Sequence, residues 1–375
     1  MLKSAKFQTL SLMVAALFTS SQGFSQKYSN EFLSIGVDAR AHGMGTVGVA
    51  TVSDVAAGYW NPAGLMHFND DLQFTFMHAA WFGNIASYDY GAVAFPISNR
   101  KSRLAASFIR LGIDNIPNTL SLFNDDGTID YNNIKQFSAS DVGILLSYAT
   151  NIAKIEGLSV GGNVKIINRN VGSFASSWGF GIDLGAQYRK KNWMFGLSMR
   201  DITGTFNAWS FNFTEKEKGV LGITGNEIPI SSVEVTRPKI ILGAAWHKDF
   251  VVNQKKVDTG AKTKTIGITG ELNVDCTTDG KRNVLVSTAV SLDPHVGIEL
   301  DYNKLVFLRA GINNIQQIST SSTTKEWVVQ PNMGLGINLG KFARIDYAYS
   351  NFGSTSGALY SHVISGIVKL QMKKK

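Results

Sequence analysis

The chain is poor in charge, in proline and above all in cysteine. Only 17% of its 375 residues are charged, against about a quarter in an ordinary soluble domain. It has 7 prolines and 1 cysteine, and the single Cys276 excludes an internal disulfide framework. The low charge indicates that much of the surface contacts something other than water.

Long hydrophobic runs are also missing beyond the first residues. No later segment approaches the roughly 20 apolar residues of a membrane-spanning helix. The one apolar run, at 10–18, follows Lys3 and Lys6 and precedes small and polar residues. This pattern predicts a secretory signal peptide over residues 1–25, cut after Ser25; the alternative is a buried N-terminal helix. We therefore expect an exported chain that is not a helical membrane protein.

Signs of catalysis or of nucleic-acid binding are absent from the sequence. The six histidines are dispersed without metal-ligand spacing, and neither G-x-S-x-G nor H-E-x-x-H occurs. The formal charge of +8 is spread over short turns and the terminal lysines. We expect no enzyme activity, no cofactor, no metal and no nucleic-acid partner.

Two-residue alternation is what the sequence has in abundance. In residues 265–276 apolar or small residues alternate without a break with polar ones, so that Leu272 and Val274 share one face and Asn273 the other. Such alternation predicts strands with one apolar and one polar face. We expect Arg to be tolerated at Asn273 but not at Leu272 or Val274. Fourteen strands are predicted, at 72–81, 86–97, 102–111, 136–149, 158–168, 176–189, 193–202, 237–248, 264–276, 283–300, 304–313, 328–339, 342–350 and 360–371.

Strand and loop lengths decide between a soluble sandwich and a closed barrel. Most segments have the length of a tilted bilayer crossing, about 9–11 residues, or exceed it, whereas sandwich strands are shorter. The connections alternate between short turns and the long loops 112–135, 203–236, 314–327 and 351–359, with 249–263 as the exception. This asymmetry is typical of outer-membrane barrels, whose short turns are periplasmic. The prediction is all-β: a fourteen-stranded antiparallel transmembrane β-barrel over 72–375, surrounded by outer-membrane lipid.

An aromatic girdle is expected on the outside of this barrel. Aromatic residues are enriched where a barrel meets the two membrane interfaces. Several lie near strand ends on faces that the pattern makes apolar, namely Tyr88, Tyr90, Trp178, Tyr188, Trp246, Tyr347 and Tyr349.

A glycine-rich stretch precedes the first strand. Gly43, Gly45 and Gly48 have the spacing G-x-G-x-x-G, which joins a strand to a helix in dinucleotide-binding proteins. No hydrophobic strand precedes them here and no βαβ pattern follows, which argues against a nucleotide site. We expect these glycines to permit close packing instead.

The same stretch resembles the N-terminal signature of the PorV/PorQ family, outer-membrane proteins of Bacteroidota within the superfamily of FadL-type long-chain fatty-acid transporters. Residues 334–353 are similar to the penultimate hairpin of that family. The N-terminal resemblance is carried by Ala39, Arg40, Gly43, Met44, Gly45, Val49, Ala50, Asp54, Ala56, Ala57 and the run YWNPAGL at 59–65.

The resemblance implies a plug and a function. Residues 26–71 would fold back as a plug, with Asn61, Pro62 and Ala63 near its end. Arg40 and Asp54 are expected to pair with lumen charges; an exposed ion pair on a periplasmic subdomain is the alternative. PorV-like function means binding type IX secretion cargo by its C-terminal signal domain and passing it from the translocon to the surface attachment machinery. The wider superfamily implies instead transport of hydrophobic small molecules through the plug and a lateral opening.

For a protein partner, the sequence offers one candidate surface. The stretch 204–235 is the longest connection on the outer rim and is unusually apolar for a solvated loop. Exposed apolar patches of this kind usually mark interaction sites. The alternative is that its side chains cap the barrel or lie on lipid headgroups. The proposed anchors are Phe206, Trp209, Phe211 and Phe213.

Overall fold

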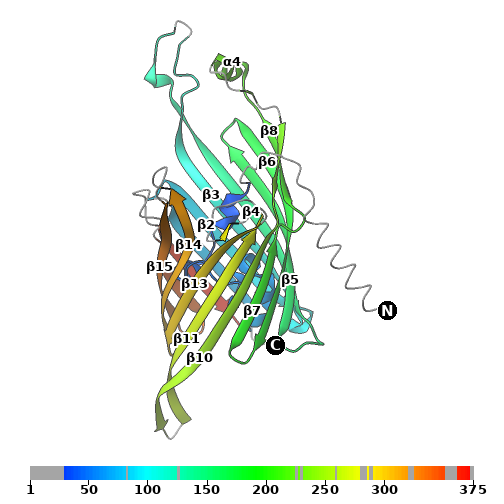
Figure 1. Ribbon diagram of the computed structural model, residues 1–375, viewed down its shortest axis with the longest axis vertical. Coiled ribbons are helices and arrows are strands. Elements are labelled where there is room, and N and C mark those ends of the chain that lie inside the picture. Colours follow the sequence, from blue (N-terminus) through cyan, green and yellow to red (C-terminus); the bar gives the residue numbers. More distant parts are fainter. Residues whose placement is uncertain are drawn as a thin grey trace, which may run out of the picture.

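The protein folds as a closed β-barrel (Figure 1). This computed structural model describes residues 29–81, 83–124, 127–223, 227–228, 231–257, 260–278, 285–286, 290–319, 325–350 and 361–371. The predicted signal peptide, residues 1–25, lies outside them. No helix in these ranges is long and apolar enough to cross a membrane.

Fourteen antiparallel strands form the wall, which confirms the predicted fold class. Each wall strand pairs with its neighbours, and β17 pairs with β1 to close the circle. Three further strands, β8, β9 and β12, belong to the same sheet. The wall strands are β1 (Leu72–Trp81), β2 (Ala86–Ile97), β3 (Ser102–Asn118), β4 (Lys135–Asn151), β5 (Leu158–Val171), β6 (Ala175–Lys190), β7 (Trp193–Arg200), β10 (Lys239–Val257), β11 (Gly260–Thr277), β13 (Ser291–Tyr302), β14 (Val306–Ser319), β15 (Lys325–Leu339), β16 (Ala343–Ser350) and β17 (Ser361–Leu370).

Alternation places apolar side chains outside and polar ones inside along most of the wall. On β11, Leu272 is 44% exposed whereas Asn273 is 1% exposed. The predicted aromatic girdle is correct in face for Trp178, which is exposed, but wrong for Tyr88 and Tyr90, which are buried inside the barrel. Tyr88 points inward because its hydroxyl donates to the carbonyl oxygen of Phe32, 3.0 Å away.

Two of the predicted connections and the start of one predicted strand are wrong. The supposed loop at 249–263 is strand: β10 and β11 remain paired from Ile240↔Cys276 to Val257↔Gly260, with one register shift, and this hairpin projects beyond the barrel (Figure 1). The supposed loop at 204–235 contains β8 (Thr205–Phe211) and β9 (Ser231–Thr236), which pair with each other. The wall strand predicted from 283 begins at Ser291, preceded by the two-residue strand β12 (Leu285–Val286).

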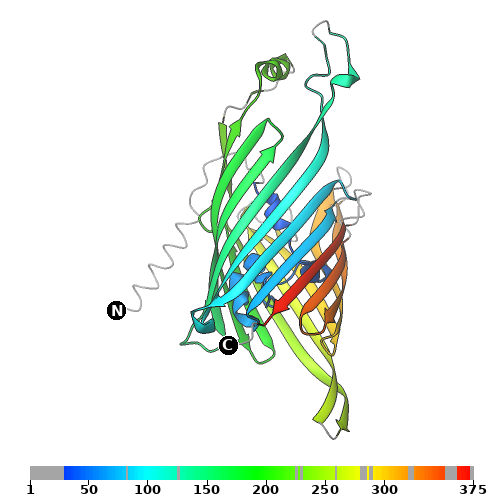
Figure 2. The same cartoon turned by 180° about the vertical axis from the view of Figure 1, so that it is seen from behind.

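The segment before β1 lies inside the barrel, as Figure 2 shows. This inner segment, residues 29–71, contains η1 (Glu31–Ser34), α2 (Ala39–Gly43), α3 (Ala57–Trp60) and η2 (Pro62–His67). Most of its residues are buried. Its apolar side chains and those of the β1–β4 wall form one core, which includes Phe32, Trp60, Tyr88 and Ile109. The remaining helices, η3 (Ser98–Arg100), η4 (Tyr131–Asn133) and α4 (Glu215–Ile223), lie outside this core.

Candidate functional site in the barrel lumen

Two glycines of the N-terminal motif, Gly43 and Gly45, lie against the backbone of the wall, whereas Gly48 packs against the Trp60 ring. A β-carbon on Gly43 would lie 2.8 Å from the α-carbon of Gly334 on β15. Gly45 has φ +73°, and a β-carbon there would lie 2.7 Å from the backbone nitrogen of Ile312 on β14. A side chain at either position would therefore collide with main-chain atoms. The motif is a packing device here, and it surrounds no phosphate-sized loop.

Asn61, Pro62 and Ala63 fix the other end of the inner segment. The Asn61 side chain caps η2 by accepting from the Ala63 nitrogen at 3.2 Å, and Pro62 occupies the first helical position, where its missing N–H costs nothing. The Asn61 amide also donates to the carbonyl oxygens of Val49 at 2.9 Å and of Ala186 on β6 at 3.0 Å. This residue therefore joins two stretches of the inner segment to the wall.

A chain of buried ion pairs links the inner segment to β13, β14 and β16. Arg40 of α2 donates to both carboxylate oxygens of Glu299, each at 3.0 Å. Glu299 also pairs with Arg309 at 2.6 Å. Arg309 continues to Asp346 at 2.7 Å, and Asp346 to Arg344 at 2.6 Å.

The chain of ion pairs returns to the inner segment at its other end. Arg344 lies 3.2 Å from Asp54 and 3.8 Å from Asp38. Both motif charges, Arg40 and Asp54, thus pair with wall charges of opposite sign. Because positive and negative side chains alternate along this network, each cation is compensated in an interior where an unpaired charge would be costly. The network ties the inner segment to the wall at two points.

Two inner-segment groups next to this network have shifted pKa values. Burial raises the pKa of Asp38 from 3.8 to about 6, against the opposing effect of Arg344. Burial lowers the pKa of His42 from 6.5 to about 4, although its hydrogen bond with the Gly36 carbonyl acts in the other direction. His42 is neutral at neutral pH, and the two groups respond oppositely to acid.

The pairing of β7 and β8 with the strands on their far side, β10 and β9, is interrupted between β7 and β8. Pairing between β7 and β10 ends at Arg200↔Lys239, and pairing between β8 and β9 begins at Thr205↔Thr236. Gly204, with φ +68°, closes a tight turn by donating to the Asp201 carbonyl at 2.8 Å. Opposite it lies Pro238, which has no N–H to give to a ladder.

The start of the inner segment is bound at this interruption. Asn30 donates from its side chain to the Thr236 hydroxyl at 2.8 Å. Asn207 of β8 donates to the hydroxyl of Ser29 at 2.7 Å and to the side-chain oxygen of Asn30 at 2.9 Å. Lys165 pairs with Asp183 at 2.8 Å and with Asp201. A cavity of about 30 Å³ lies among these residues.

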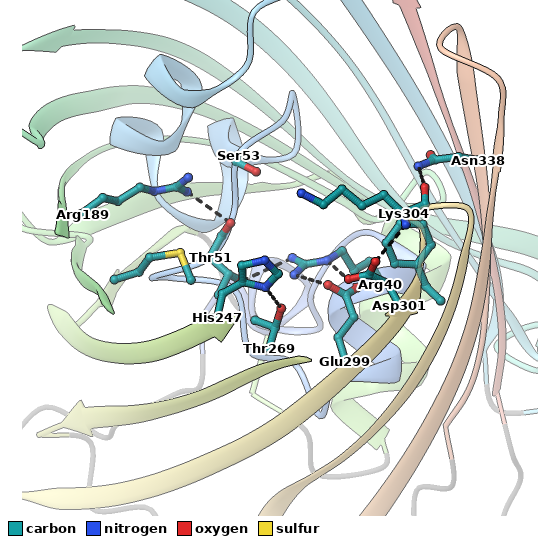
Figure 3. A pocket seen from close by; sticks show the side chains of 12 residues that line it. Arg40, Thr51, Ser53, Arg189, His247, Thr269, Glu299, Asp301, Lys304 and Asn338 are labelled. Carbon is teal, nitrogen blue, oxygen red and sulfur yellow. Dashed lines mark hydrogen bonds and ion pairs between the residues drawn. The ribbon is translucent and has the colours of Figure 1, made fainter. Parts of the chain in front are cut away.

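A larger cavity, of about 270 Å³, lies at the short-turn end of the lumen (Figure 3). Its walls come from the inner segment and from β6, β7, β10, β11, β13, β14 and β15. Most lining side chains are polar, with Met194 and Phe307 as the apolar exceptions. No group of three or more His, Cys, Asp or Glu side chains in the described ranges is placed to hold a metal ion.

The four aromatic residues proposed as anchors do not form one patch. Phe206 is 45% exposed and packs with Phe180, their ring centres 6.0 Å apart. The rings of Trp209, Phe211 and Phe213 stack on one another at 6.2 and 6.3 Å. Arg169 lies 5.1 Å over the Trp209 ring. These residues lie in or just after a strand, and their partner-binding role stays a prediction.

Several residues of the lumen site were not anticipated from the sequence. Arg309 and Glu299 carry the centre of the ion-pair network, and Arg189 enters the larger cavity. Their inward positions in the alternation of β6, β13 and β14 were the only available signal. Alternation predicts the face but not the partner, because the partner depends on register between strands.

Comparison with solved structures extends this description. The Pseudomonas putida toluene transporter TodX is 12% identical over 90% of this chain and 99% of its own, with a TM-score of 0.52. The monoaromatic hydrocarbon channel CymD is 12% identical over 91% and 99%, with a TM-score of 0.50. A Pseudomonas aeruginosa FadL homologue is 12% identical over 89% and 98%, with a TM-score of 0.47. No protein-family model matches the chain, and no curated protein matches it.

The fold defines a class of protein: a closed antiparallel β-barrel of fourteen strands, the architecture of outer-membrane barrels. Its particular fold is shared with transporters and channels of hydrophobic compounds, TodX and CymD among them. At this level of identity the likeness concerns the fold.

Proposed function

We propose that the protein transports small hydrophobic compounds across the outer membrane, with the inner segment as the plug of the barrel. The fold supports this proposal, since TodX is a toluene transporter and CymD is a monoaromatic hydrocarbon channel. The FadL-type superfamily, which the N-terminal motif resembles, has the same kind of substrate.

The observation that carries the proposal is the interruption of the wall between β7 and β8. A solute that leaves the lumen sideways needs a place where neighbouring strands are not hydrogen-bonded, because a paired wall is continuous. The gap between Arg200↔Lys239 and Thr205↔Thr236 is such a place. The first described residues of the plug, Ser29 and Asn30, are bound there, so moving them would open the path.

A reversible tether tests this path. In a variant with Cys276→Ser, the changes Asn30→Cys and Thr236→Cys place two thiols where side chains now touch at 2.8 Å. Oxidation of this pair should abolish uptake of radiolabelled toluene into proteoliposomes, and a reductant should restore it. The control pair is Leu146→Cys with Val164→Cys, which face each other on β4 and β5 and should leave uptake unchanged. Uptake no faster than in protein-free vesicles would reject transport altogether.

A second candidate function is the binding of secreted proteins. As the resemblance to PorV implies, the ligand would be the C-terminal signal domain of type IX secretion cargo. The supporting observation is the tall side of the rim, where β3, β4, β8 and α4 project beyond the other strands (Figure 1). Exposed apolar side chains there include Phe123, Ile129, Tyr131, Ile223 and Val233, each more than half exposed. Such a surface fits a protein partner better than water.

Capture of a cargo domain tests the second candidate. The exposed set Phe206, Val233 and Val235, changed together to Ser, should abolish binding of a purified C-terminal signal domain to the inserted barrel. The stacked set Trp209, Phe211 and Phe213, changed to Ser in a separate variant, serves as the comparison. Equal binding by the wild type and the exposed-set variant would remove the β8–β9 hairpin from the interface.

A further inference from the structure

Three cationic side chains enter the 270 Å³ cavity from different elements. Figure 3 shows Arg189 of β6 and Lys304 of the β13–β14 turn pointing into the cavity from opposite sides, with Arg40 of α2 between them. Because like charges repel, each of these cations needs a partner of opposite sign.

Arg189 is the cation held mainly by neutral groups, with the charge of Glu271 acting on it from beyond ion-pairing distance. Its guanidinium donates to the carbonyl oxygens of Thr51 at 3.3 Å and of Val52 at 3.1 Å. No carboxylate in the described part of the chain lies within ion-pairing distance of it. Its Nε is buried and has no hydrogen-bond partner there. A buried guanidinium held by neutral carbonyls keeps its full charge available to a ligand.

The other two cations line the same cavity. Arg40 donates to the hydroxyl of Thr51 at 3.3 Å, so two guanidinium groups converge on one residue. The Lys304 side chain is 62% exposed, and its ammonium is 3.2 Å from Asp249. A charge this exposed remains open to a ligand, because pairs in water are weak.

The acidic side chains of the cavity are already engaged. Glu299 lies between Arg40 and Arg309. Asp301 accepts from the backbone nitrogen of Lys304 at 2.9 Å. Arg40 is thus paired with Glu299 and Lys304 with Asp249, which leaves Arg189 as the guanidinium of this cavity without an ion pair among the described residues. The cavity is large enough for a small molecule, and an anion is the ligand that would pair with Arg189.

We propose that this cavity binds small organic carboxylates at the short-turn, periplasmic end of the lumen. The fork of a guanidinium matches the two oxygens of a carboxylate. Met194 and Phe307 give the cavity an apolar part, which suits the hydrocarbon portion of an organic acid and offers nothing to inorganic phosphate. The site goes beyond the proposed transport of hydrophobic compounds and does not depend on it.

Calorimetric titration of the full mature protein in detergent tests the proposal. Benzoate is the probe, benzamide is its uncharged counterpart, and inorganic phosphate is the competing anion. We expect benzoate to bind at least ten times more tightly than either. The change Arg189→Gln should weaken benzoate binding at least tenfold. The change Lys101→Gln, an exposed lysine of the β2–β3 turn outside the cavity, should leave it unchanged.

A second variant covers the structural contacts of Arg189. If Arg189→Gln does not fold, Lys304→Gln on the exposed turn replaces it and should weaken benzoate binding severalfold. The proposal is overturned if benzoate does not bind, if benzamide or phosphate binds as tightly, or if folded cavity variants bind benzoate like the wild type. Loss of toluene uptake with intact benzoate binding would reject transport alone.

Discussion

Gly43 of the inner segment and Gly334 of β15 meet at main-chain distance: a β-carbon on the first would lie 2.8 Å from the α-carbon of the second. Neither residue can carry a side chain without moving a helix or a strand. The glycine motif is therefore needed because the inner segment and the wall lie at main-chain distance at this point.

A larger side chain at Gly334 should push the inner segment away from the wall. We expect Gly334→Val to lower the free energy of unfolding by about 1–3 kcal/mol, the usual cost of overpacking. Gly270→Val on β11 is the matched control, because a β-carbon there would meet nothing within 4 Å. Urea unfolding in lipid vesicles, followed by tryptophan fluorescence, measures both. Equal stability of the two variants would contradict the contact.

Arg309 should be the most sensitive member of the ion-pair network. Its side chain is 0% exposed and pairs with both Glu299 and Asp346. Removing one partner of a buried pair typically costs about 3–5 kcal/mol, since the remaining charge stays buried. Arg309→Leu should show a loss of this order in the same urea assay. Lys218→Gln, from an exposed pair on α4, should have almost no effect, and a similar result for both would mean that the network adds little.

A charged residue on the outer face of β11 should destabilise the protein more, the closer it lies to the bilayer midplane. Leu272→Arg is expected to cost about 2–4 kcal/mol near the bilayer midplane, and the same change at Ile266, close to the short-turn end, about 0–1 kcal/mol. Asn273→Arg, expected from sequence to be mild, should also be costly, because Asn273 is 1% exposed inside the barrel. Folding yields into vesicles at increasing urea give the three values. No dependence on depth would argue against lipid contact.

Acid should affect two neighbouring residues of the inner segment in opposite directions. With a pKa of 6.5 unfolded and about 4 folded, His42 binds protons more readily in the unfolded chain, so its contribution to stability is lost as pH falls from 6.5 to 4. With a pKa of 3.8 unfolded and about 6 folded, Asp38 binds protons more readily in the folded chain, so its contribution is lost as pH rises from 4 to 6.

Each substitution should expose the response of the other residue. Between pH 4 and 6, Asp38→Asn should gain stability with rising pH more steeply than the wild type. His42→Gln should lose stability over the same range. Urea midpoints at half-unit intervals of pH measure the slopes, and parallel profiles for all three proteins would count against the assigned shifts.

Most wall strands were predictable from the sequence because their two faces have different surroundings. Lipid favours apolar side chains on the outer face, and the water and inner segment within the barrel favour polar ones on the inner face. The prediction failed where both faces are apolar or the faces are exchanged. Strand β8 carries Phe206 on its outer face and the stacked rings of Trp209 and Phe211 on the opposite face. Both faces are therefore apolar, and the sequence shows no alternation there. On β2 the tyrosines face inward and Asp89 faces outward, 2.7 Å from His78, and the pattern does not say which face is inside.

The lumen site was predictable only in part. Arg40 and Asp54 stood out because they belong to the motif, but their partners Glu299 and Arg344 are brought close by strand register, which a single sequence does not specify. The cavity around Arg189 is lined by the inner segment and by strands from β6 to β15, which come together only when the barrel closes.

The contacts of the inner segment also bear on how the barrel is made. Gly43 touches β15, Gly45 touches β14 and Asn61 is bonded to β6, so a segment synthesised before every strand meets opposite sides of the finished wall. Once the last strand has joined the first, side chains as large as Trp60 have no wide opening through which to enter. We therefore expect the segment to be in place before the last strand joins the first.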